Sequence, residues 1–163
     1  MKKVFRILLV AVLCFVALRS SGAFADPKAF DFYGIYDPSG KLAESERAAL
    51  DAKLEEIYDE HDMSVYLWVL SGEGVSMADF VRKFFADSVA PYAGKIKYGV
   101  IFALDMKTND YFATSFPGVD RVKNAFTVQY LNSAVGSSFS SASSIFEALN
   151  NLADALQKRA EEM

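Results

Sequence analysis

The chain has 163 residues, of which 52% are hydrophobic, and its 17 basic and 21 acidic side chains give a net charge of −4. This acidic balance disfavours nucleic acid and anionic membrane surfaces as partners. One cysteine and one histidine are too few for a zinc centre, which needs several such ligands.

The first 25 residues have the pattern of an export signal. A basic segment with Lys2, Lys3 and Arg6 precedes an uncharged apolar run, and Ala23-Phe24-Ala25 has the small-residue pattern of a cleavage site. The apolar run, residues 7–18, is shorter than the roughly 20 residues that span a bilayer. We therefore expect residues 1–25 to be a signal peptide, rather than an uncleaved anchor, and the protein to be periplasmic or secreted.

Removal of this leader changes the charge and the cysteine content. The leader holds four of the 17 basic residues and none of the 21 acidic ones, so the mature chain would carry 13 basic and 21 acidic residues, a net charge of −8. Cys14 would be lost with the leader. The alternative, a lipoprotein anchored at Cys14, is disfavoured because Leu13 is too large for the position before a lipidated cysteine. We expect residues 26–163 to be one domain without a disulfide, a nucleic-acid partner or a transmembrane anchor.

The first elements alternate between helix and strand. After an aromatic lead-in, Asp37-Pro38-Ser39-Gly40 has the residues of a turn, and apolar spacing predicts a helix over residues 42–60. The apolar run Met63 to Leu70 predicts a strand, and Ser76 is placed to cap a second helix whose apolar residues recur with helical spacing. A strand also follows this helix, which predicts a parallel crossover.

The stretch Tyr98 to Phe116 predicts a hairpin at the centre of the sheet. Residues 98–104 are apolar at consecutive positions, as in a strand buried on both faces, and Lys107 to Asp110 supply turn residues before a second strand over 110–116. We expect this second strand to pair antiparallel with the first.

The C-terminal part predicts two more helices. Residues 119–134 have helical spacing, and the serine-rich residues 133–144 are typical of a surface loop that ends in a helix cap. Ile145 then begins a last amphipathic helix. This order of elements predicts an α/β fold, a three-layer α/β sandwich with a small mixed sheet flanked by helices.

Carboxylates at the ends of elements are the candidate site residues. Asp105 with Asp120 or with Asp37 is predicted to form a site for Ca²⁺ or Mg²⁺, cations that prefer oxygen ligands. The alternative is that each is simply a turn residue, for which aspartate is common. His61 lies at the predicted end of a helix beside Asp62, so we expect it to have a structural role rather than a catalytic one.

The order of these segments resembles the TPM domain family. The segment Ile35 to Leu42 with the helix after it is similar to the opening of TPM domains, and Gly99 to Asp105 is similar to their central strand. The resemblance covers nearly the whole mature chain. It implies an α/β sandwich, and it implies the acid phosphatase activity and divalent-cation binding associated with the plant thylakoid-lumen members.

The chain departs from the family pattern on both sides of the hairpin. Lys97-Tyr98 stands where the family has an acidic residue and asparagine, and Ser115 to Asp120 replaces a glycine-rich turn. We expect the charge of Lys97 to weaken a cation site by repulsion. The leading hypothesis is therefore a non-catalytic or weakly catalytic module that binds another envelope protein or assembly. The alternatives are a cation-dependent phosphomonoesterase and, ranked last, a small-ligand binding protein.

Overall fold

The computed structural model describes residues 31–72, 74–92, 94–116 and 125–163. Residues 32–163 form one compact unit. The helices and strands of this unit, in chain order, are β1 (Gly34–Tyr36), α2 (Glu44–His61), β2 (Met63–Leu70), α3 (Met77–Phe84), the π-helical turn η1 (Phe85–Val89), the 3-10 turn η2 (Ala90–Tyr92), β3 (Tyr98–Asp105), β4 (Asp110–Phe116), α5 (Val128–Ser141) and α6 (Ile145–Glu161).

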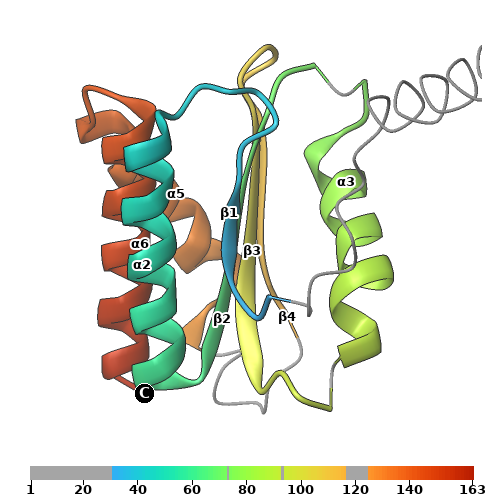
Figure 1. Ribbon diagram of the computed structural model, residues 1–163, viewed down its shortest axis with the longest axis vertical. Coiled ribbons are helices and arrows are strands. Elements are labelled where there is room, and N and C mark those ends of the chain that lie inside the picture. Colours follow the sequence, from blue (N-terminus) through green and yellow to red (C-terminus); the bar gives the residue numbers. More distant parts are fainter. Residues whose placement is uncertain (1–30, 73, 93, 117–124) are drawn as a thin grey trace, which may run out of the picture. The chain divides into compact units, whose positions relative to one another are not determined.

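These elements form three layers, as predicted. The four strands make one mixed sheet in the order β1-β2-β3-β4. Helices α2, α5 and α6 lie on one side of it and α3 lies on the other (Figure 1). The fold is therefore an α/β sandwich built on a small sheet.

The sheet has the predicted strand directions. Strands β1, β2 and β3 are parallel, and β4 is antiparallel to β3. Leu70 lies beside Asp105 in the register, and Tyr36 lies beside Trp68. Because the three parallel strands end at the same edge of the sheet, the segments that follow them meet there.

Strand β1 was not predicted, because its three residues lie within the aromatic lead-in. A side chain of α2 holds it in place, since the Ile35 N–H donates to the Asp51 carboxylate at 2.9 Å. The aromatic lead-in packs on α2, because the Phe32 and Tyr58 rings stack with centroids 5.6 Å apart.

The prediction for the serine-rich segment was right at its end, because Ser144 caps α6, and wrong for residues 133–141. These residues are not a surface loop but most of helix α5, which begins after Thr127, whose side chain accepts a hydrogen bond from the Tyr130 N–H. Leu131, Ala134, Val135 and Ser138 are buried along one side of this helix. Serine destabilises a helix only slightly. Burial of the residues at i, i+3, i+4 and i+7 stabilises α5 by more than the serines cost. The predicted helix over residues 119–134 lies partly outside the described residues.

The two faces of the sheet bury different side chains. Toward α2, α5 and α6 lies an aliphatic core to which β2 contributes Met63, Val65, Leu67 and Val69. Toward α3 lies an aromatic layer, in which the Trp68 ring stacks on one ring and meets others edge-on. Its members are Tyr36, Tyr66, Trp68, Phe80, Phe84, Phe85 and Phe116.

Gly99 is the position where this packing allows no side chain. A Cβ atom there would lie 2.2 Å from the Ser64 carbonyl oxygen and 2.4 Å from Cζ of Phe116. The first of these atoms belongs to the backbone of β2, so the clash could be relieved only by separating the two central strands. Glycine is therefore required here because the β2 backbone and the Phe116 ring approach β3 so closely.

We expect Gly99→Ala to lower the free energy of unfolding by about 3 kcal/mol, because overpacking against backbone forces the strands apart. Gly94→Ala is the matched control, since no heavy atom lies within 4 Å of its added Cβ, and it should change stability by less than about 0.5 kcal/mol. Urea unfolding followed by circular dichroism measures both. Equal midpoints for the two variants would contradict this account of Gly99.

Candidate functional site

The predicted carboxylates lie at the edge where the parallel strands end. Asp37 follows β1 and Asp105 ends β3, with β2 between them. Two strand spacings put the backbones of these residues about 10 Å apart. Asp120, the third predicted ligand, lies outside the described residues.

Asp105 holds two loops together. Its side chain is buried, and its Oδ1 accepts hydrogen bonds from the Gly72 N–H at 2.9 Å and the Lys107 N–H at 2.8 Å. The Lys107 N–H is the main cause that lowers the pKa of Asp105, burial opposes it, and the Gly72 N–H adds to the lowering. The carboxylate is therefore charged at neutral pH and accepts from the loop after β2 and from the β3–β4 turn.

Asp37 organises the turn between β1 and α2, as the sequence predicted. Its carboxylate accepts a hydrogen bond from the Ser39 hydroxyl, and another from the Leu42 N–H at 2.8 Å. Burial pushes the pKa of Asp37 upward, but these hydrogen bonds and those from the Lys41 and Gly40 N–H groups hold it below the ordinary value. Asp37 is thus an anion bound by its own turn.

A third carboxylate at this edge serves a helix. The Asp110 side chain accepts a hydrogen bond from the Met77 N–H at 3.0 Å. Met77 is the first residue of α3, whose first N–H groups have no partner within the helix. The sequence placed Asp110 in a turn but gave no signal for this long-range contact, because its partner lies 33 positions away.

The geometry constrains a cation site here. The described residues contain no group of three or more His, Cys, Asp or Glu side chains that could hold a metal ion. Asp37 and Asp105 do not by themselves fit one shared Ca²⁺ or Mg²⁺, since each carboxylate already binds N–H donors and their backbones are two strands apart. A shared ion would require both side chains to leave these donors.

Lys97 does not lie near this edge. It precedes β3, whose first residue, Tyr98, lies beside Met63 in the register, and it forms an ion pair with Asp62. The expectation that Lys97 weakens a cation site at Asp105 by repulsion is therefore wrong, because an eight-residue strand separates the two.

His61 lies at the same distant edge as Lys97. It ends α2 just before β2, so β2 separates it from the level of Asp105 by roughly 25 Å. Its Nε2 atom is buried without a hydrogen bond among the described residues, and it lies 3.8 Å from the Glu60 carboxylate. His61 and Asp105 therefore do not form part of one catalytic arrangement.

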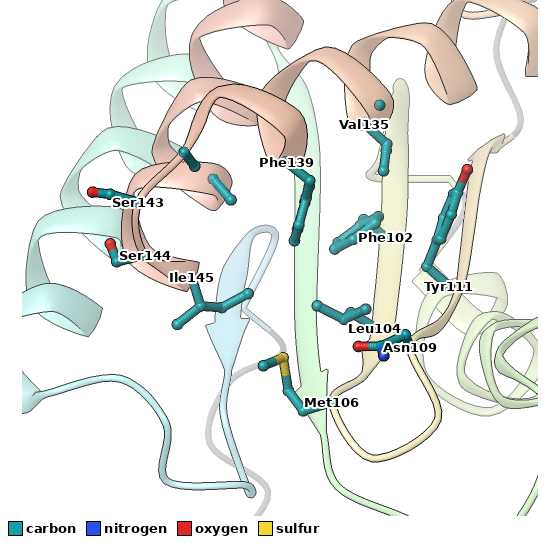
Figure 2. A pocket seen from close by; sticks show the side chains of 13 residues that line it. Phe102, Leu104, Met106, Asn109, Tyr111, Val135, Phe139, Ser143, Ser144 and Ile145 are labelled. Atoms are coloured by element: carbon teal, nitrogen blue, oxygen red, sulfur yellow. The ribbon is translucent and has the colours of Figure 1, made fainter.

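A pocket of about 480 Å³ lies on the other face of the same hairpin. The buried side chains of Phe102 and Leu104 and the half-buried ring of Phe139 form its floor, and Figure 2 shows Met106 and Ile145 as further lining residues. The hairpin, α5, α6 and the loop between these helices all contribute to it. Its full lining is Phe102, Leu104, Met106, Asn109, Tyr111, Val135, Gly136, Phe139, Ala142, Ser143, Ser144, Ile145 and Ala148.

The polar groups of the pocket belong to a few uncharged side chains. Asn109, Tyr111, Ser143 and Ser144 supply an amide and three hydroxyls. Ser143 donates its hydroxyl hydrogen to Glu147 at 2.6 Å, and the Ser144 hydroxyl accepts from the Glu147 N–H at 3.1 Å. The sequence gave no sign of this pocket, since its α5 wall was predicted to be a surface loop.

Comparison with known proteins supports the fold. A TPM domain family model matches residues 35–159. The structure is similar to the BA42 protein of Bizionia argentinensis, with 10% identity, a TM-score of 0.60 and coverage of 74% of this chain and 82% of that one. It is also similar to the N-terminal domain of the cg2496 protein of Corynebacterium glutamicum, with 15% identity, a TM-score of 0.56 and coverage of 85% and 86%.

A third solved structure, the N-terminal domain of a protein from P. gingivalis, shares 16% identity and a TM-score of 0.61, with coverage of 78% of this chain and 82% of that one. No curated protein matches the sequence. Within the part of the chain that the structure describes, no helix has both the length and the apolar character needed to cross a membrane.

We expect Asp105→Asn to destabilise the protein at pH 7, because a charge-assisted acceptor becomes a neutral one. The folded pKa of Asp105 is lowered from 3.8, so its stabilising contribution is present above pH 3.8 and is lost as pH falls through the folded value. The variant should therefore lose less stability than the wild type on acidification below about pH 4. Urea unfolding at several pH values measures this.

Asp59→Asn is the control, because Asp59 is an exposed residue of α2. It should unfold with the wild-type pH dependence. If Asp105→Asn and Asp59→Asn show the same pH dependence, the carboxylate of Asp105 does not hold the two loops.

Proposed function

The chain belongs to the TPM domain family, and from that premise we propose that it is a non-catalytic or weakly catalytic binding module of the cell envelope. It is exported, loses residues 1–25 by cleavage near Ala25, and acts in the periplasm or outside the cell. Its target is another envelope protein, and its role is accessory to the activity of that protein.

The observation that carries this proposal is that the Asp105 carboxylate is occupied by backbone hydrogen bonds. It is buried, and it accepts N–H groups from the loops on both sides of it. A catalytic base or nucleophile needs its reactive atom within reach of substrate. The histidine lies at the opposite edge of the sheet, so it cannot activate a nucleophile beside Asp105.

The charge of the mature chain supports a protein partner rather than a polyanion. The net charge of −8 repels nucleic acid and anionic lipid headgroups. At the edge with Asp37 and Asp105, the pKa values of both carboxyl groups are lowered, so both add negative charge at neutral pH. A partner with a basic surface would be attracted to this edge.

The same charges favour a second candidate, a divalent-cation-dependent phosphomonoesterase. In it Asp37, Asp105 and Asp120 would be the ligands of Ca²⁺ or Mg²⁺, and the cation would polarise a phosphoryl oxygen. The favouring observation is that the two described carboxylates are ionised and lie at one edge of the sheet. The candidate requires these side chains to exchange N–H donors for the ion.

We expect the exported, purified protein to hydrolyse p-nitrophenyl phosphate no faster than its Asp105→Asn variant, with or without Ca²⁺ or Mg²⁺. The assay follows the release of nitrophenolate at several pH values. Asp59→Asn serves as the control for surface charge. Metal-dependent turnover that Asp105→Asn abolishes and Asp59→Asn retains would overturn the binding-module proposal and establish the phosphatase.

We also expect calorimetric titration with either cation to give no binding heat that depends on Asp37 and Asp105. The measurement compares the wild type with Asp37→Asn and with Asp105→Asn at millimolar metal. A saturable heat that both substitutions remove would show that the carboxylates leave their N–H donors to bind the ion.

A further inference from the structure

We propose that the pocket between the β3–β4 hairpin and helices α5 and α6 binds a small uncharged amphiphile, with an apolar body and one neutral hydrogen-bonding end. This goes beyond the binding-module proposal, because it concerns a ligand on the face of the sheet opposite Asp105. It also does not depend on whether the domain hydrolyses phosphate esters.

The size of the pocket points to a small molecule rather than one inserted side chain. Its volume of about 480 Å³ falls within the range of about 300–1,000 Å³ that is typical of ligand sites. The floor is made of aromatic and aliphatic side chains from both layers, with Phe102 of β3 and Phe139 of α5 in contact at a centroid distance of 5.7 Å. An apolar body placed there would be removed from water on several sides.

Gly136 is an exposed residue of α5 that lines the pocket. It lies inside α5, where a glycine costs roughly 1 kcal/mol relative to alanine. Its φ is not positive, and no heavy atom lies within 4 Å of an added Cβ, so neither backbone geometry nor crowding requires it. Its missing side chain leaves free a part of the pocket that a larger side chain would occupy.

The charges around the pocket select a neutral ligand. Among its lining residues there is no Lys, Arg, His, Asp or Glu, so an ionised end group would lose hydration without gaining a partner. The Glu147 carboxylate at the start of α6 accepts hydrogen bonds from Ser143, which hold the pKa of Glu147 below its ordinary value. It stays ionised and repels an anionic ligand in particular.

The mouth offers hydrogen bonds to a neutral end group. Asn109 is an exposed lining residue that lies beside Leu104 in Figure 2, and its amide can both donate and accept. Tyr111, two residues further along the hairpin, also lines the pocket and is 41% exposed. An alcohol or amide group at the mouth would meet these two side chains while its apolar body lies on Phe102.

The experiment is a fluorescence titration of the exported protein with phenylnaphthylamine, an uncharged dye that brightens in apolar surroundings. Decanol, decanoate and decylammonium then compete for the dye site at pH 8. We expect decanol to displace the dye about tenfold more effectively than either ion. Absence of saturable dye binding, or equal displacement by decanoate and decanol, would overturn the proposal.

Two substitutions locate the binding site. Gly136→Leu fills the pocket and should weaken dye binding about tenfold or more. Asn132→Leu adds the same apolar side chain to α5 at an exposed residue outside the pocket, and it should bind the dye as the wild type does. Equal binding by the two variants would show that the dye binds elsewhere and would overturn the assignment.

A third substitution tests the polar mouth and guards against failure of Gly136→Leu to fold. Asn109 has a φ of 57°, which glycine adopts without strain, so Asn109→Gly removes the amide and keeps the turn. It should weaken decanol binding about three- to tenfold, as expected for one hydrogen bond. Unchanged decanol binding would contradict the role of Asn109 at the mouth.

Discussion

The structure depends most on the pair of hydrogen bonds that the Asp105 carboxylate accepts. Three parallel strands end at one edge of the sheet, and each must be followed by a loop with unpaired N–H groups. Asp105 binds one such group from the loop after β2 and one from the turn after β3. A backbone bond between the Met106 N–H and the Leu70 carbonyl oxygen, 2.9 Å long, joins the same two segments. One buried carboxylate thereby accepts the hydrogen bonds that water would otherwise accept from both loops.

This arrangement explains why carboxylates gather at the edge without forming a metal cluster in the described residues. Asp37, Asp105 and Asp110 each accept N–H groups from a turn, a loop or the start of a helix. Such groups carry partial positive charge and stabilise the ionised carboxylate, as a bound cation would also do. Aspartates at strand ends are therefore weak evidence of a metal site until their partners are known.

The sequence predicted most of the fold because the relevant signals are local. The apolar runs of β2 and β3, the Ser76 cap of α3 and the turn at Asp37 each follow from neighbouring residues. The three failures each involve long-range packing. Strand β1 is too short for a period and depends on Asp51 of α2, and helix α5 is rich in serine and depends on a buried stripe.

The third failure concerned Lys97, and it shows why distance along the chain is a poor guide to electrostatics. Lys97 and Asp105 are close in sequence, yet β3 carries them to opposite edges of the sheet, where Lys97 pairs with Asp62. The pocket escaped prediction for a related reason, since its walls come from β3, β4, α5 and α6 and no single segment contains its pattern. A site assembled from several elements can be recognised only when the positions of those elements relative to one another are known.

The pocket and the carboxylate edge share one piece of structure, the turn between β3 and β4. Leu104 faces the pocket, while the next residue, Asp105, faces the opposite side, as alternation along a strand requires. Within the turn, Met106 and Asn109 line the pocket and Lys107 donates to Asp105. A turn of four residues cannot move on one face of the sheet without moving on the other. The position of the turn therefore affects both faces of the sheet. A group bound in the pocket that shifts this turn would also change the hydrogen bonds of Asp105, because the backbone connects the two.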